Sequence, residues 1–332
     1  METIPLLYHP VTALVVDSSA AFLRSLALHL PGNDRVYCLC SHPMLALEKL
    51  KQSDEEATFI NQMWVNPTRQ LDQQQSAVTA KHENIQGQLR DKSRFGNVFA
   101  VVLEHEMSPL NGLQLCKRIV NPFVQKVLLT ASVHEQMIDR AKQQGLVDAV
   151  IYKHDPNMLQ KLSQVLQHAQ ERYFHLISAA YSEALQIEEE AKAFLGDRAF
   201  RDFFAQLRQG LGTIEHHVYG YPDGFVLVDA SGTCHGLCVQ TKEQFDTLAA
   251  SSILQQASEQ VQHDIRKRRK MLCVPRACCM PQAQQWDGHV QPAQVVSGLD
   301  TYYCACVRGM FHVSEVTGFA TYENKIDLRL AS

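Results

Sequence analysis

The chain has 332 residues, of which 45% are hydrophobic and 20% charged. That composition is typical of globular proteins, and the length favours two domains. The formal net charge of -4 gives no overall attraction to nucleic acid or to anionic membranes. No apolar run approaches the roughly 18 residues needed to span a bilayer, and the start of the chain lacks the pattern of a signal peptide. We therefore expect a cytoplasmic protein without membrane insertion, whose ten cysteines are mostly reduced thiols.

Short apolar runs alternate with helical patterns over residues 1–155. These runs are Thr12 to Val16, Val36 to Cys40, Val98 to Leu103, Val127 to Leu129 and Ala149 to Tyr152. Such alternation predicts an α/β domain with a five-stranded parallel sheet that is covered by helices on both faces. A segment rich in polar residues, 53–97, interrupts the pattern before the third run. We interpret it as an insertion, which is either a surface excursion or an interaction arm.

Polar residues stand at the ends of four of these runs. They are Asp17, Glu104, Thr130 and Lys153, in chain order. Open α/β sheets place their ligands at the carboxyl ends of the strands. We therefore expect the four side chains to converge on one crevice.

The order of these four sites, with Met107 and Gly112 in the loop after Glu104, resembles the receiver domain of two-component response regulators. The resemblance implies a flavodoxin-like, doubly wound fold. In receivers, an acid pair after the first strand binds Mg²⁺ and an aspartate after the third accepts phosphate. The Thr and Lys positions recognise the phosphoryl group. Here Ser18 occupies the second acid position and Glu104 the acceptor position.

Both departures weaken phosphoryl transfer. Asp17 and one glutamate offer less negative charge to Mg²⁺, which relies on carboxylates together with phosphate oxygens. Glutamate also moves its carboxylate outward by one methylene, roughly 1.5 Å, whereas transfer is sensitive to errors of about 1 Å. We expect a pseudo-receiver with weak or absent Mg²⁺ binding, in which Glu104 is a permanent negative charge paired with Lys153 near Thr130. The alternative is an inert acid in a domain that serves only as a scaffold for dimerisation.

Residues 156–196 read as a helical connector. Apolar residues recur there at heptad spacing: Leu159, Leu162, Leu166, Ala169, Tyr173, Leu176 and Ala180. This seam predicts that the last helix of the receiver-like domain continues into a connector that pairs with its copy in a homodimer. The alternative is a helix packed on its own chain.

Residues 197–332 predict a smaller α+β output or sensory domain. The pattern contains an amphipathic helix over 199–211, a hairpin over 223–240, a helix from the capping box at Thr241 to about Lys270, and a strand from Thr301 to Val307. The segment Gly298 to Tyr303 and the final element Phe319 to Tyr322 are similar to quorum-sensing-type response regulators. In that family the C-terminal domain is PAS-like and does not bind DNA.

The sequence gives little support for a metal site, for nucleic-acid binding or for catalysis. Seven cysteines lie between Cys234 and Cys306, but no Cys-x-x-Cys pair supports a zinc site. The basic run Arg266 to Lys270 is explained by the favourable place of cations at a helix C-terminus, so nucleic acid is not an expected partner. No catalytic constellation stands out, and we expect no enzyme.

The sequence thus predicts phosphorelay-type intracellular signal transduction by an atypical response regulator that acts through protein–protein contacts. One alternative is a ligand- or metal-sensing regulator that acts through the C-terminal domain. A third interpretation is a DNA-binding transcription regulator.

Overall fold

The computed structural model describes residues 3–32, 34–65, 87–131, 135–184, 193–219, 224–251, 254, 257–273, 289–308, 316–322 and 325–330. The chain divides into two compact units, each of which gathers several stretches of sequence. The parallel unit comprises His9–Met63, Asp91–Ala180 and Tyr322–Ser332. The antiparallel unit comprises Met1–Tyr8, Trp64–Arg90 and Tyr181–Thr321. No helix in the described ranges combines the length and hydropathy needed to cross a membrane.

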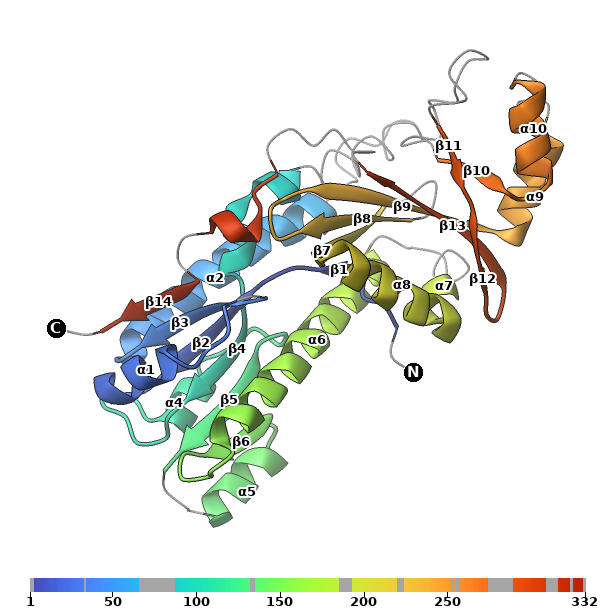
Figure 1. The fold of residues 1–332 in the computed structure, drawn as a ribbon. Coiled ribbons are helices and arrows are strands. Elements are labelled where there is room, and N and C mark those ends of the chain that lie inside the picture. Colours follow the sequence, from blue (N-terminus) through green and yellow to red (C-terminus); the bar gives the residue numbers. More distant parts are fainter. Residues whose placement is uncertain are drawn as a thin grey trace. The chain divides into compact units, whose positions relative to one another are not determined.

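The parallel unit is built on a six-stranded sheet with the order β14-β3-β2-β4-β5-β6, in which every neighbouring pair is parallel (Figure 1). Its strands are β2 (Thr12–Val16), β3 (Val36–Cys40), β4 (Val98–Leu103), β5 (Gln125–Thr130), β6 (Ala149–Tyr152) and β14 (Ile326–Arg329). The five predicted strands and the doubly wound α/β class are confirmed, and their order is that of flavodoxin-like folds. The predicted number of strands was one too low, because the C-terminal strand β14 pairs with β3 at the edge of the sheet.

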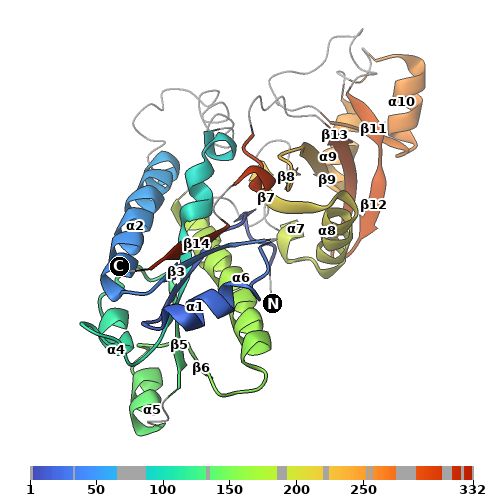
Figure 2. The same ribbon diagram turned by 60° about the vertical axis from the view of Figure 1, so that its left-hand side comes forward.

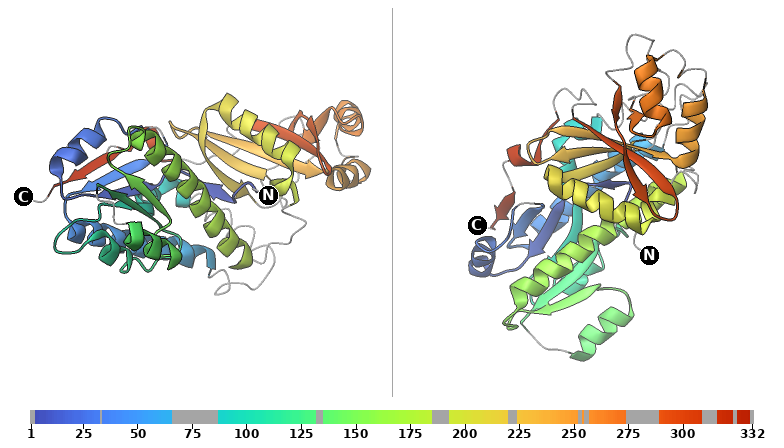
Figure 3. Two further views of the ribbon diagram at one scale, coloured as in Figure 1. Left: turned by 90° about the horizontal axis from the view of Figure 1, so that it is seen from below. Right: turned by 45° about the vertical axis from the view of Figure 1, so that its right-hand side comes forward.

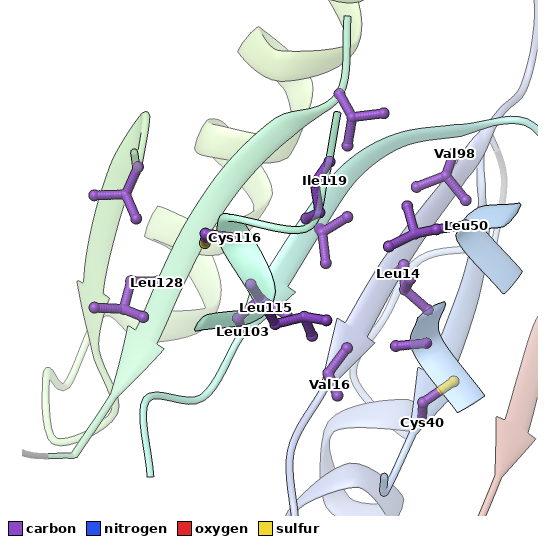
Figure 4. Packing of buried hydrophobic residues seen from close by; sticks show 14 of the residues in the cluster. Leu14, Val16, Cys40, Leu50, Val98, Leu103, Leu115, Cys116, Ile119 and Leu128 are labelled. Carbon is purple, nitrogen blue, oxygen red and sulfur yellow. The ribbon is translucent and has the colours of Figure 1, made fainter. Parts of the chain in front are cut away.

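Helices cover both faces of this sheet. They are α1 (Ala20–Ala27), α2 (Pro43–Val65), the 3-10 helix η2 (Lys92–Gly96), α4 (Gly112–Cys116), α5 (Glu135–Gln143) and α6 (Met158–Ala184). Helices α1 and α6 lie on one face and α2, α4 and α5 on the other (Figure 3). The second face encloses an apolar core in which Leu14, Leu103 and Leu128 of the strands pack in one cluster with Leu50 of α2 and Leu115 of α4 (Figure 4). The first residues of the predicted insertion, 53–65, continue α2, and 66–86 lie outside the described residues.

Part of the apolar seam of α6 is buried within the parallel unit. Leu162, Leu166, Ala169 and Tyr173 are all buried. The ring of Tyr173 meets that of Phe99 of β4 edge to face, with centroids 6.4 Å apart. The continuous helix predicted after β6 is present, but its seam packs on its own sheet over these residues. Of the other seam residues, Leu176 is half-buried, and Leu159 and Ala180 are exposed, so the predicted pairing with a second copy stays a prediction.

The antiparallel unit is built on a second six-stranded sheet with the order β1-β7-β8-β9-β13-β12 (Figure 2). Its strands are β1 (Leu7–Tyr8), β7 (Thr213–Tyr219), β8 (Gly224–Asp229), β9 (Cys234–Thr241), β13 (Thr301–Arg308) and β12 (Gln294–Ser297). Helices α7 (Ala193–Gly196) and α8 (Arg198–Leu211) pack with one face through a phenylalanine-rich core. The predicted α+β class of this part is confirmed.

Three further elements cover the other face of that sheet. They are α9 (Lys242–Ala250), α10 (Glu259–Arg266) and the hairpin of β10 (Lys270–Leu272) and β11 (Val290–Pro292). The capping box at Thr241 and Gln244 is present. The prediction of one helix from there to Lys270 was wrong, because Ser251 adopts an extended conformation after α9 and Ser258 caps a separate helix.

Each end of the chain belongs to the unit whose other residues lie farther away in the sequence. The N-terminal strand β1 pairs with β7 of the antiparallel sheet, whereas the C-terminal strand β14, which follows the 3-10 helix η6 (Phe319–Thr321), pairs with β3 of the parallel sheet. The sequence-based boundaries, 1–155 and 197–332, instead assigned each end to the domain nearest in sequence. Short terminal strands complete sheets far away along the chain, and such pairings leave little local signal.

Candidate functional site

The predicted site residues stand at the carboxyl ends of adjacent strands. Asp17 follows β2, Glu104 follows β4, Thr130 ends β5 and Lys153 follows β6. The parallel pairings β2–β4, β4–β5 and β5–β6 align these four ends. The sheet therefore brings the four residues to one edge, as ligand-binding open sheets do.

Lys153 joins the two acids of this edge. Its Nζ donates to Asp17 Oδ2 and also contacts Glu104 Oε2. The side chains of Asp17, Glu104 and Lys153 are 3%, 8% and 18% exposed, so all three are largely withdrawn from water. We call these three residues the acid–lysine triad. An ammonium ion between two nearly buried carboxylates is an arrangement that low local dielectric strengthens.

Backbone N–H groups donate hydrogen bonds to the remaining carboxylate oxygens of Asp17 and Glu104. Ser19 N–H donates to Asp17 Oδ1 at 2.8 Å. His105 N–H donates to Glu104 Oε1 at 2.5 Å, with a longer contact of 3.3 Å from Glu106 N–H. Each of the four oxygens of the two carboxylates thus has a donor within the chain. A cation that needs these oxygens would have to displace Lys153 from them.

Burial and charge act in opposite directions on Lys153. Burial, which is the largest single effect, lowers the pKa of its ammonium group. The hydrogen bonds to Asp17 and Glu104 and the negative charge of both acids outweigh burial and raise that pKa above the ordinary lysine value. Lys153 therefore stays charged at neutral pH.

Two further residues help to shape the triad, Phe22, which the sequence did not single out, and Gly112, which belongs to the receiver-like pattern. The ring of Phe22 on α1 lies under Lys153, with its centroid 4.5 Å from Nζ, in the geometry of a cation–π contact. Gly112 begins α4 where its backbone passes the Glu104 carbonyl, and a Cβ there would lie 2.5 Å from that oxygen. Neither role has a clear sequence signal, although Gly112 was already part of the receiver-like pattern.

The other two predicted site residues lie around the triad. Thr130 is buried, and its carbonyl accepts a hydrogen bond from Lys153 N–H at 2.9 Å. Ser18 is exposed between Asp17 and Ser19, the N-cap of α1. The position at which receivers carry a second acid thus presents a neutral side chain to solvent, outside the triad.

The second unit contains a similarly built polar contact. Asp197 caps α8 by accepting from Ala199 N–H at 2.8 Å, and it also accepts from Leu299 N–H at 2.6 Å. A Cβ on Gly298 would collide with the Asp197 carboxylate. The sequence segment Gly298 to Tyr303 therefore contains a glycine because the turn between β12 and β13 rests directly on this buried acid.

Cysteines and basic residues of this unit take part in local packing. Cys238 and Cys273 are buried in one apolar cluster, and a hydrogen bond between their thiols together with burial raises the pKa of Cys238. Arg268 pairs with Asp246 at 2.6 Å, and Lys270 contacts Asp264 at 3.2 Å. Cys278 and Cys279 lie outside the described residues. Within the ranges that the structure describes, no group of three metal-binding side chains is present.

Comparisons with known proteins agree with this architecture. No protein-family model matches the sequence, and no characterised protein is significantly similar to it in sequence. Among solved structures, there is one whose fold is similar over nearly the whole chain. This structure is that of the response regulator LqsR of Legionella pneumophila, with a TM-score of 0.78 and 24% identity over 98% of this chain and 97% of that chain. The chain therefore has the fold of that response regulator throughout both units.

Shorter proteins match only part of the chain. The response regulator TrrA of Thermotoga maritima, solved in complex with Mg²⁺ and BeF, aligns at 16% identity over 48% of this chain and 98% of that chain, with a TM-score of 0.31. The resemblance to response regulators that the sequence indicated is confirmed for the fold by the whole-chain match.

Proposed function

We propose that this protein is a response regulator that transmits signals through protein–protein contacts without phosphorylation of its receiver site. The acid–lysine triad carries the proposal. Glu104 supplies a permanent negative charge at the acceptor position, and Lys153 holds that charge together with Asp17. In this arrangement the site keeps one charge state and does not cycle between a phosphorylated and an unphosphorylated form.

The donor set fits Mg²⁺ poorly. Magnesium prefers octahedral oxygen coordination at about 2.0–2.1 Å and keeps several waters beside one or two carboxylates and phosphate. The two carboxylates of the triad already accept from Lys153 and from backbone N–H groups. Ser18 replaces the additional acid. The protein is therefore proposed to work without a bound metal cofactor.

The rest of the chain supports an output through protein partners. Two of the five cations in the basic run Arg266 to Lys270 contact acids of their own unit, which reduces the charge available to a phosphate backbone. We accordingly propose a cytoplasmic, non-enzymatic regulator that does not act on nucleic acid directly.

A phosphodonor experiment tests the proposal. The wild type and the double variant Ser18→Asp/Glu104→Asp are incubated with Mg²⁺ and a small phosphodonor, and the intact mass of each is then measured. The double variant restores the second acid and shortens the acceptor side chain by one methylene. We expect no phosphoryl group on the wild type and a labile one on the double variant.

Two controls sharpen the experiment. The single variant Ser18→Asp retains Glu104, so it should stay unmodified and show that the acceptor side chain matters. Adding the phosphodonor without Mg²⁺ should leave all variants unmodified. A phosphoryl group on the wild type that disappears in Glu104→Gln would overturn the proposal.

A further inference from the structure

Two cysteines lie side by side on one face of β3 in the parallel unit. The Sγ atoms of Cys38 and Cys40 are 3.8 Å apart, which lets one thiol donate a hydrogen bond to the other. Both side chains belong to the apolar core under α2 and are 1% and 0% exposed (Figure 4). We call them the β3 thiol pair. Buried cysteines usually act as small hydrophobic side chains, so a reactive role depends on what surrounds them.

Charged groups surround the β3 thiol pair. The thiol of Cys38 donates to Asp327 Oδ2 of β14 at 3.8 Å, and Asp327 also pairs with Arg329 at 2.7 Å. Lys49 of α2 is 8% exposed, no described residue forms an ion pair with it, and its charge acts on Cys38. A buried cation without an acid is unfavourable, and a nearby thiolate would balance its charge.

These surroundings favour the thiolate of Cys38. The hydrogen bond with Cys40 has the largest effect on the pKa of Cys38 and lowers it, and the positive charges of Arg329 and Lys49 lower it further. Burial and the negative charge of Asp327 act in the opposite direction without reversing the shift. Reactive cysteines stand beside cations in this way, because the thiolate is the nucleophile.

The edge strand β14 covers the β3 thiol pair on one side. It has four residues, stands last in its sheet, and places Asp327 and Arg329 opposite Cys38 and Cys40. A hollow of about 790 Å³ adjoins its end, lined by Leu330, by His42 and by side chains of α2. That volume is within the range of small-molecule sites. Short elements with few buried contacts open locally, so a small molecule in the hollow reaches the thiols when β14 moves aside.

We propose that Cys38 and Cys40 form a reversible oxidation site that reacts with a low-molecular-weight disulfide. The Cys38 thiolate attacks one sulfur of that disulfide, and the Cys38 proton, passed through Asp327, goes to the thiol that leaves. Cys40 then attacks the Cys38 sulfur of the mixed disulfide. The Cys38–Cys40 bond forms, and a second thiol leaves with the proton of Cys40. Two electrons and two protons thus pass from the cysteines to one disulfide, which becomes two thiols.

The bond between these positions should be strained and easily reduced. Alternate residues of a strand have Cα atoms about 6.6 Å apart, at the upper end of the roughly 4.4–6.8 Å that disulfides span. Strained disulfides are the labile, regulatory kind, which is also the kind that the cytosol permits. Oxidation should bend β3 and weaken its pairing with β14, so amide hydrogen exchange at Ile326–Arg329 should be faster in the oxidised protein. Unchanged exchange would contradict this coupling. The proposal does not depend on the acid–lysine triad.

The test follows oxidation of the folded protein by oxidised glutathione. After the reaction, free thiols are alkylated in denaturant and the oxidised cysteines are located by peptide mass. The peptide with Cys38 and Cys40 should escape alkylation, lose two hydrogens, and regain them with a thiol reductant. Cys40→Ser lacks the second thiol, so it should retain one glutathione on Cys38, whereas Cys38→Ser should retain none on Cys40. A wild type whose two β3 thiols are both alkylated, or a Cys40→Ser variant without the mixed disulfide, would overturn the proposal.

A second thiol contact serves as an internal control. Cys238 and Cys273 lie in one apolar cluster of the antiparallel unit, where their hydrogen bond and burial raise the pKa of Cys238. They should remain reduced under conditions that oxidise the β3 thiol pair. Oxidation of Cys238 and Cys273 before the β3 thiol pair would show that thiol contact, and not the charged surroundings, decides reactivity.

A pair of lysine variants tests the charged surroundings directly. Lys49→Met removes the buried cation beside Cys38, so the rate of oxidation should fall at least about twofold. Lys51→Met is the matched control on the same helix, because Lys51 is 79% exposed and contacts Glu55. It should react at the rate of the wild type. Equal rates for the two lysine variants would refute the role assigned to Lys49.

Discussion

Lys153 contacts Glu104 and Asp17 at the same time, across the carboxyl ends of three strands that are far apart in the sequence. This relationship gives the receiver-like edge a fixed set of charges. Two carboxylates and one ammonium leave one net negative charge, and backbone N–H groups stabilise it. We propose that this fixed charge takes the place of a phosphoryl group.

Removing the ammonium should destabilise the protein strongly. Lys153→Met leaves two nearly buried carboxylates without their cation, and breaking a buried pair in this way costs about 3 kcal/mol of unfolding free energy. Lys161→Met is the matched control, because Lys161 is 54% exposed and pairs with Asp155 on the surface. Lys161→Met should lower the unfolding free energy by less than about 1 kcal/mol. Denaturant unfolding of both variants and the wild type measures the difference, and equal losses would contradict the account.

The same lysine predicts how stability depends on pH. Because the folded-state pKa of Lys153 is raised above its ordinary value of 10.5, its contribution to stability is fully present below that value and is lost as pH rises through the folded pKa. The difference in unfolding free energy between the wild type and Lys153→Met should thus be constant near neutral pH and shrink in the alkaline range above the ordinary value. A difference that grows with alkaline pH would be inconsistent with a raised pKa.

Gly112 should tolerate no side chain. In Gly112→Ala, the new Cβ would lie 2.5 Å from the Glu104 carbonyl oxygen, so the loop after Glu104 must shift. We expect a loss of about 1–3 kcal/mol, typical of overpacking. Gly210→Ala in α8 is the control, since nothing lies within 4 Å of the Cβ that this substitution would add. Gly210→Ala should stabilise the protein by up to about 1 kcal/mol. Thermal unfolding should therefore show a lower melting temperature for Gly112→Ala and a higher one for Gly210→Ala.

Asp197 should contribute more to the unfolding free energy than Asp202, an exposed acid of the helix that Asp197 caps. Asp197→Ala removes the N-cap of α8 and the acceptor for Leu299 N–H, so we expect a loss of about 2 kcal/mol in unfolding free energy. Asp202→Ala changes an acid that is 68% exposed and meets Arg198 at 3.9 Å, and it should cost less than about 1 kcal/mol. Similar losses for both variants would show that the turn does not depend on this carboxylate.

Much of the parallel unit was predictable from the sequence because its strands are apolar runs separated by helical patterns. Asp17, Glu104, Thr130 and Lys153 could be located because receiver-like spacing places them at strand ends. The pairing of Lys153 with Glu104 was predicted, whereas the second contact of Lys153, with Asp17, was not. Ser18 could be recognised only as a departure from that pattern.

The missed elements share a physical cause. Strands β1 and β14 have two and four residues, and each is stabilised by a partner strand far away in the sequence. Periodicity cannot identify such pairings. The same limit explains the seam of α6, since heptad spacing shows that one face of a helix is buried but does not show whether a sheet or a second copy buries it.

The most direct test of the central claim is a double-mutant cycle between Glu104 and Lys153, using Glu104→Gln, Lys153→Met and the double variant. Unfolding free energies from denaturant titration give the coupling between the two side chains. The account predicts a favourable coupling of at least about 1 kcal/mol, because the two groups are in contact and largely buried. Additive effects of the two substitutions would show that Glu104 and Lys153 do not act as a pair and would contradict the fixed, phosphate-free site.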